Sequence, residues 1–175
     1  MKKKILSIFY AFLATLLITT SAGAGGSVKL SSATFSLGSL IADGTLSRLG
    51  RTDVTVVLIG TGPSDITCTN PGSNDVPGQS SPKVSAYGEQ LLNGNDPLRK
   101  NGWSPFKVET EDPQISWIEG GCPGENWSAR IDFTYYSEAT IQVYDTSTGS
   151  LLLEQRYTCI TARYPSPTVS CTPTA

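Results

Sequence analysis

The sequence predicts an all-β protein, an antiparallel β-sandwich, and leaves an immunoglobulin-like arrangement open. Two observations predict this fold. Apolar and polar residues alternate in many short runs, as they do in half-buried strands. These runs are separated by turns rich in Gly, Pro, Asn and Asp, and no long stretch after the N-terminal segment has helical spacing free of helix breakers.

The N-terminal half contains the first of these runs. Residues 28–37 hold apolar side chains in two alternating phases, which predicts a strand with a bulge near Ser31 and Ser32. Asp43 and Gly44 predict a tight turn. Residues 54–59 are apolar on both faces, which is typical of a central strand.

The clearest strand lies in the C-terminal half, over residues 126–136. Its apolar side chains occupy every second position: Trp127, Ala129, Ile131, Phe133 and Tyr135. Two further alternating runs, 139–143 and 151–157, flank a short loop that ends at Gly149. This pattern predicts a β-hairpin in which the glycine supplies a positive φ.

Shorter alternating runs at 84–86 and 106–108 bring the expected total to about eight or nine strands. Residues 69–82 and 92–103 are rich in turn formers and are expected to be loops. We expect one β-sandwich domain over residues 25–165, followed by a C-terminal tail at 166–175.

The N-terminus has the three parts of a secretory signal peptide. A basic start at residues 1–4 precedes an apolar run at 5–18 and the sequence Ala22-Gly23-Ala24, which fits a cleavage site. The apolar run is shorter than the roughly 20 residues that a membrane-spanning helix needs. We therefore expect residues 1–24 to be removed, and the mature chain to be extracellular and not inserted in a membrane.

All four cysteines, Cys68, Cys122, Cys159 and Cys171, lie in the predicted mature chain. An even number of cysteines in an exported protein is typical of disulfides, and three pairings are open. We favour Cys68 with Cys122 and Cys159 with Cys171, because the second bridge would tie the tail to the last strand. A zinc site is disfavoured, because the sequence has no histidine and no C-x-x-C pair.

The charge of the mature chain bears on its partners. Without residues 1–24 it has 10 basic against 15 acidic residues, a net charge of −5. Nucleic acids and anionic membranes are bound through accumulated positive charge. We therefore expect neither as the main partner.

The absence of histidine excludes the common Ser-His-Asp and Cys-His catalytic sites. A pair of carboxylates would suffice for a glycosidase-like hydrolase. The candidates are acids near the middle of the chain, for which solvated loop positions are the commoner explanation: Glu109, Glu111, Asp112, Glu119 and Glu125. We expect no enzyme and no cofactor.

Three short motifs have an ordinary structural explanation. Residues 93–96 are rich in side-chain oxygens, but they lack the spacing of an EF-hand and fit a turn. Residues 145–147 resemble an aspartic-protease loop except that Ser147 replaces the required glycine, and the predicted hairpin explains them. Asn126 begins a sequon, and its glycosylation depends on the host.

The three tryptophans are candidates for recognition because aromatic faces bind sugars and partner proteins. Trp103 and Trp117 lie in loop-like surroundings and are the candidate binding residues. Trp127 is in phase with apolar residues of its strand and is expected in the core.

Two segments resemble a pattern in small exported β-sandwich proteins of uncharacterised function. They are residues 68–72 with 77–79, and Cys122-Pro123 with residues 126–129. The resemblance extends over most of the mature chain. It implies export and disulfides, and no activity or catalytic residue comes with it.

The sequence thus favours a secreted, non-enzymatic recognition or surface-associated protein that binds a glycan or an extracellular protein through its loops. The alternative is a structural subunit of an extracellular filament or layer, self-assembled by strand pairing through residues 25–38. A carboxylate-based hydrolase is the third hypothesis.

Overall fold

The computed structural model describes residues 27–37, 39–97, 99 and 102–174. In this part of the chain all regular structure is strand, so the all-β prediction is confirmed. No helix among these residues has the length and apolar character needed to cross a membrane. The predicted signal peptide, residues 1–24, lies outside the described residues.

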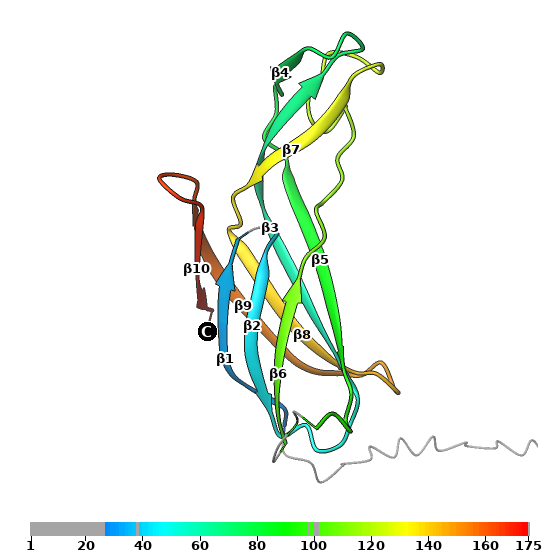
Figure 1. The fold of residues 1–175 in the computed structure, drawn as a ribbon, viewed down its shortest axis with the longest axis vertical. Helices are drawn as coiled ribbons and strands as arrows, with labels where there is room; N and C mark the ends of the chain where they lie inside the picture. The colour runs from blue at the N-terminus through cyan, green and yellow to red at the C-terminus, as the bar shows by residue number, and fades with distance from the viewer. Residues whose placement is uncertain (1–26, 38, 98, 100–101, 175) are drawn as a thin grey trace, which may run out of the picture.

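Two antiparallel sheets pack against each other (Figure 1). The smaller sheet has the order β1-β2-β6, with β1 Lys29–Ser36, β2 Ile41–Ser47 and β6 Trp103–Glu109. In the larger sheet five strands cover the smaller one, in the order β5-β3-β8-β9-β10. Their bounds are β3 Val54–Thr69, β5 Lys83–Leu92, β8 Glu138–Asp145, β9 Leu151–Ala162 and β10 Thr168–Pro173.

The core lies between the sheets and consists of the side chains that alternate inward. Its fully buried side chains include Leu40, Leu46, Leu58, Val108 and Ile141. Neighbouring residues in the same strands point to solvent, because successive side chains of a strand face opposite ways. This confirms the antiparallel β-sandwich.

The strand β3 is much longer than the predicted 54–59. Its first part pairs with β5 and β8, and from Ser64 onward it pairs with β7 (Ser128–Thr134) and β4 (Asp75–Pro77). Gly62 permits this continuation, since a Cβ there would lie 1.9 Å from the carbonyl oxygen of Tyr135. The end of β3 therefore projects beyond the sandwich, where Figure 1 shows it with β4 and β7.

We call this projecting part the extension: residues 64–82 and 111–134. A second apolar cluster, separate from the main core, holds it together. The buried members are Ile66 and the disulfide-bonded Cys68 and Cys122, and partly buried side chains pack on them: Ile115, Trp117, Trp127, Ala129 and Ile131. The stretch 69–82 was expected to be a loop, but it contains the short strand β4, which folds back and pairs with the end of β3.

The predicted turn at Asp43 and Gly44 is wrong, because β2 continues through both residues. Gly44 has a packing role instead. A Cβ at this position would lie 2.4 Å from the Ser32 carbonyl oxygen and 2.5 Å from the Phe106 ring. The missing side chain makes room for these neighbours, so this glycine marks a close approach of strands.

Three other local predictions are confirmed. The pairing of β1 with β2 shifts register between Leu30 and Ser32, where the bulge was expected. The strand predicted over 126–136 is β7 at its centre. Gly149 has a φ of 68° in the turn between β8 and β9.

Both disulfides link the pairs that the sequence analysis favoured. Cys159 and Cys171 lie directly opposite each other in β9 and β10. Cys68 in β3 is bonded to Cys122 in the segment that covers the extension. The Cys159–Cys171 bridge holds the edge strand β10 in place, and the Cys68–Cys122 bridge closes the extension.

The turn between β8 and β9 makes a pH-dependent contribution to stability. The carboxylate of Asp145 accepts hydrogen bonds from Ser147 Oγ at 2.6 Å, Ser147 N at 2.9 Å and Thr148 N at 3.0 Å. The side-chain bond from Ser147 and the backbone bond from Thr148 are the main reasons why the pKa of Asp145 is lowered. This stabilisation is complete above the unfolded-state pKa and is lost as the pH falls through the lower folded-state pKa.

We therefore expect the variant Asp145→Asn to unfold at lower urea concentration than the natural protein near neutral pH. The difference should disappear in buffer acidic enough to protonate Asp145 in the folded state. Urea unfolding followed by circular dichroism measures both midpoints. The control is Glu125→Gln, at an exposed acid whose side chain forms no hydrogen bond to another described residue, and it should show no such difference.

Candidate functional site

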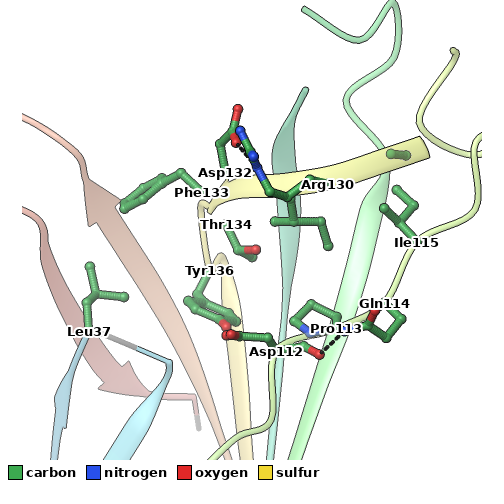
Figure 2. A pocket seen from close by; sticks show the side chains of 12 residues that line it. Leu37, Asp112, Pro113, Gln114, Ile115, Arg130, Asp132, Phe133, Thr134 and Tyr136 are labelled. Atoms are coloured by element: carbon green, nitrogen blue, oxygen red, sulfur yellow. Dashed lines mark hydrogen bonds and ion pairs between the residues drawn. The ribbon is translucent and has the colours of Figure 1, made fainter. Parts of the chain in front are cut away.

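A groove of about 440 Å³ lies where the extension joins the sandwich. One wall is β7, and the other is the extended segment 112–115, which Figure 2 shows on the opposite side. Leu37, after β1, and Tyr136, between β7 and β8, border the groove at its sandwich end. Segments far apart in the sequence therefore form this site.

The edge of β7 borders the groove. Six consecutive residues of this strand, Ala129 to Thr134, line the space. Successive side chains of a strand point to opposite faces, so an unbroken series of lining residues indicates that its edge is exposed there. β7 pairs with β3, and no other described strand pairs with it. Its second edge is thus available for a further strand.

The opposite wall also has free backbone groups. Pro113 has no N–H, and the N–H groups of Gln114 and Ile115 donate to no described residue. The only hydrogen bond of Gln114 among the described residues runs from its side chain to the carbonyl oxygen of Asp112. Both walls therefore offer backbone hydrogen-bonding groups to a ligand.

The side chains of the groove combine an apolar floor with a charged rim. Ile115 and Ile131 belong to the second apolar cluster, and Leu37 lies at the far end (Figure 2). Tyr136 is buried, which raises its pKa, although hydrogen bonds to Thr110 and Leu40 oppose this rise. Its phenol is therefore neutral at physiological pH.

Asp112, Arg130 and Asp132 provide the charges of the rim, and the two carboxylates do not form a catalytic pair. Asp132 accepts a hydrogen bond from the Arg130 guanidinium at 3.1 Å and one from Thr67. Figure 2 shows Asp132 pointing away from Asp112, on the far side of β7. The two acids thus do not face each other across the groove.

The other acids considered for hydrolysis do not line the groove: Glu109, Glu111, Glu119 and Glu125. Two hydrogen bonds from Ser116 lower the pKa of Glu119, and the bond from its hydroxyl has a larger effect than the bond from its backbone N–H. Among the described residues there is no group of three or more His, Cys, Asp or Glu side chains able to hold a metal ion.

An aromatic cluster around Arg163 adjoins the groove at Phe133. The Arg163 guanidinium lies 5.4 Å from the Phe133 ring and 5.7 Å from the ring of Tyr164, and both contacts are cation–π interactions. Asp65 forms an ion pair with Arg163 at 2.7 Å and accepts a hydrogen bond from the Tyr135 hydroxyl at 3.0 Å. Tyr164 is 79% exposed. No sequence pattern indicates this cluster, because its members come from β3, from β7 and the residue after it, and from the β9–β10 turn.

The candidate tryptophans do not share a surface. Trp103 is 50% exposed at the start of β6, at the end of the sandwich farthest from the extension (Figure 1). Trp117 is half-buried and packs in the second apolar cluster, as does Trp127. Asn126 is exposed beside Trp127. Neither candidate tryptophan borders the groove.

Comparisons with known proteins show no family for this chain. No family model matches it, and no curated protein matches it. Two solved structures overlap it weakly, a calcium-binding mutant of Bacteroides uniformis beta-glucuronidase 2 and a Bacteroides uniformis beta-glucuronidase. Both are 10% identical to this chain, with TM-scores of 0.28 and 0.27. The match covers 78% of this chain, and the chain spans 13% of the length of those proteins.

Proposed function

We propose that this is a secreted, non-enzymatic recognition protein that binds an extended segment of an extracellular protein in the groove. The free edge of β7 carries this proposal. An extended peptide can join such an edge as an added strand, because main-chain hydrogen bonds supply affinity independently of sequence. The signal-peptide pattern and the two disulfides support an oxidising, extracellular location.

The side chains around the groove favour a protein partner. Energetically dominant residues of protein interfaces are enriched in tyrosine and arginine. Arg163, held between Phe133 and Tyr164, provides such a group next to the edge of β7. Ile115 and Ile131 provide an apolar surface for the inward-pointing side chains of an added strand. Main-chain hydrogen bonds to β7 would then supply affinity, and the side chains around the groove would supply specificity.

The alternative of a self-assembling subunit has less support. Residues 29–36 form β1, which pairs along its length with β2 of the same chain. Strand exchange through residues 25–38 would require this pairing to be broken first. Addition of a second copy to the other edge of β1 would not, but the groove contains no residue of β1.

A displayed library of random peptides, panned against the purified protein, tests the proposal. Selected peptides are then measured by fluorescence anisotropy against natural protein and variants. We expect Gln114→Trp, which places an indole at the mouth of the groove, to weaken binding about tenfold or more. Phe133→Ala should also weaken peptide binding, because it removes a side chain that lines the groove and contacts Arg163.

The matched control is Thr148→Trp, which places the same indole in the distant turn between β8 and β9. It should leave peptide binding unchanged. Peptides that bind Gln114→Trp and the natural protein equally would show that the groove is not the site. A library that yields no binder would count against the proposed function itself.

A further inference from the structure

A second surface with the character of a binding site lies on the outer face of β5, β3, β8 and β9. It has two hollows of about 340 and 330 Å³, and Gln142 lines both of them. Neither hollow shares a lining residue with the groove. We propose that this face, which we call the outer face, binds a neutral oligosaccharide. The proposal does not depend on the peptide groove.

The centre of the outer face is a row of four side chains that crosses four strands. Val57 of β3 lies opposite Glu89 of β5 on one side and opposite Gln142 of β8 on the other. Gln142 in turn lies opposite Glu154 of β9. Directly opposed residues project from the same face of a sheet. At a strand spacing of about 4.8 Å the row spans about 14 Å, which is long enough for more than one sugar ring.

Two tyrosines approach this row from its two sides. Tyr87 lies opposite Ile59 and Tyr144 lies opposite Thr55, so the rings start from positions on either side of Val57. Tyr87 donates a hydrogen bond to Glu89 at 2.8 Å, and Tyr144 donates one to Gln142 at 2.9 Å. Both hydroxyls therefore converge on the row.

Between the two tyrosines the floor of the hollow is the apolar side chain of Val57, which its neighbours cover. Val57 points outward, and yet it is only 5% exposed, whereas Tyr87 is 50% exposed. The side chains around Val57 thus stand above it and form the walls of a hollow with an aromatic ring accessible to solvent.

Hydrogen bonds hold the polar side chains of the row in place. The Gln142 amide donates to Glu154 at 2.8 Å, and Arg156 donates to the other oxygen of the same carboxylate at 2.8 Å. Donors and acceptors that are already fixed lose little conformational entropy when a ligand binds. The row is therefore preorganised.

The chemistry of this face fits a sugar. Aromatic rings pack against the apolar faces of sugar rings, and planar amide and carboxylate groups bind their hydroxyls. The charge around the two hollows selects among sugars. The lining residues include four acids, Glu89, Glu138, Asp145 and Glu154, against one base, Arg156, and Lys83 pairs with Glu138 at 3.0 Å. This excess of negative charge repels uronic acids and sulfated sugars. A neutral oligosaccharide is the class that remains complementary.

Affinity electrophoresis of the purified secreted protein tests this inference. The gels contain mixed-linkage β-glucan, xyloglucan, galactomannan or dextran, with polygalacturonate as the acidic comparison. We expect at least one neutral polysaccharide to retard the protein and polygalacturonate not to retard it. Tyr87→Ala and Gln142→Ala should each weaken the retardation about tenfold, since each removes a group that converges on the row.

The conservative variant Gln142→Glu keeps the size of the side chain and adds a fifth acid, so it should also weaken binding. Urea midpoints close to that of the natural protein establish that each variant is folded. Tyr164→Ala, which removes an exposed tyrosine elsewhere, should bind polysaccharide normally.

The groove variant Gln114→Trp should also keep polysaccharide binding, which separates this inference from the proposed function. Three results would overturn it: no retardation by any of the four neutral polysaccharides, retardation by polygalacturonate alone, or unchanged retardation of folded Tyr87→Ala and Gln142→Glu.

Discussion

Replacement of both Cys68 and Cys122 by alanine is expected to lower the free energy of unfolding by about 4 kcal/mol. This bridge closes a loop with a sequence separation of 54 residues, and the chain-entropy model assigns about 4 kcal/mol to a loop of that length. The bridge is also the buried centre of the second apolar cluster. We therefore expect the variant to lose peptide binding in the groove as well. Urea unfolding and the anisotropy assay measure the two effects.

The double variant of Cys159 and Cys171 is the matched control. Its loop has a separation of only 12 residues, and the same model gives about 3 kcal/mol. This bridge lies outside the second apolar cluster, so the two walls of the groove stay in place. Peptide binding should therefore fall less than in the Cys68 and Cys122 variant, although the β9–β10 turn carries Arg163. Loss of peptide binding in this control but not in the Cys68 and Cys122 variant would contradict the assigned roles of the bridges.

Leu58→Ala is expected to be destabilising by about 2–5 kcal/mol, since removal of a fully buried leucine side chain leaves a cavity. Leu58 lies in the first part of β3, opposite Ile141 of β8, and its side chain points into the main core. Its neighbour Ile59 is half-buried and points to the outer face. Ile59→Ala should therefore cost only about 1 kcal/mol.

The difference between these neighbours tests the register of β3 directly. Chemical denaturation of both variants gives the two free energies. Equal losses, or a larger loss for Ile59→Ala, would show that the strand presents its other face to the core.

Much of the sandwich could be predicted from the sequence, because the pleat of a strand imposes alternation on any sheet with one solvated face. The hairpin at Gly149 and the bulge in β1 were predicted for the same local reason. The turn prediction at Gly44 is wrong because it depends on a local pattern alone, in which a glycine after aspartate is typical of a turn. In the structure it serves a contact with Phe106, a residue distant in the sequence.

The extension was not predicted, because Gly60, Gly62 and Pro63 are typical of the end of a strand. β3 continues there because its end pairs with β7, and Gly62 leaves room for the backbone of Tyr135; no local pattern indicates either contact. The groove could not be predicted for a similar reason. Its walls, 112–115 and 129–134, are distant in the sequence and are brought together by contacts of the second apolar cluster, which no local pattern indicates.

The candidate residues were chosen by type, and the structure distinguishes them by location. Tryptophans are common in binding sites, yet Trp117 packs inside the extension. The strand edge of the groove consists of backbone groups, which side-chain chemistry does not reveal. The row of the outer face depends on register between β5, β3, β8 and β9, which the sequence alone does not provide.

The most direct test of peptide recognition is a nuclear magnetic resonance titration of the isotope-labelled protein with a selected peptide. We predict that the backbone amide shifts change most in β7, residues 128–134, and in the facing segment 112–115. Largest changes in the loops 69–82 or 92–103, or on the outer face around Val57, with β7 unaffected, would contradict it.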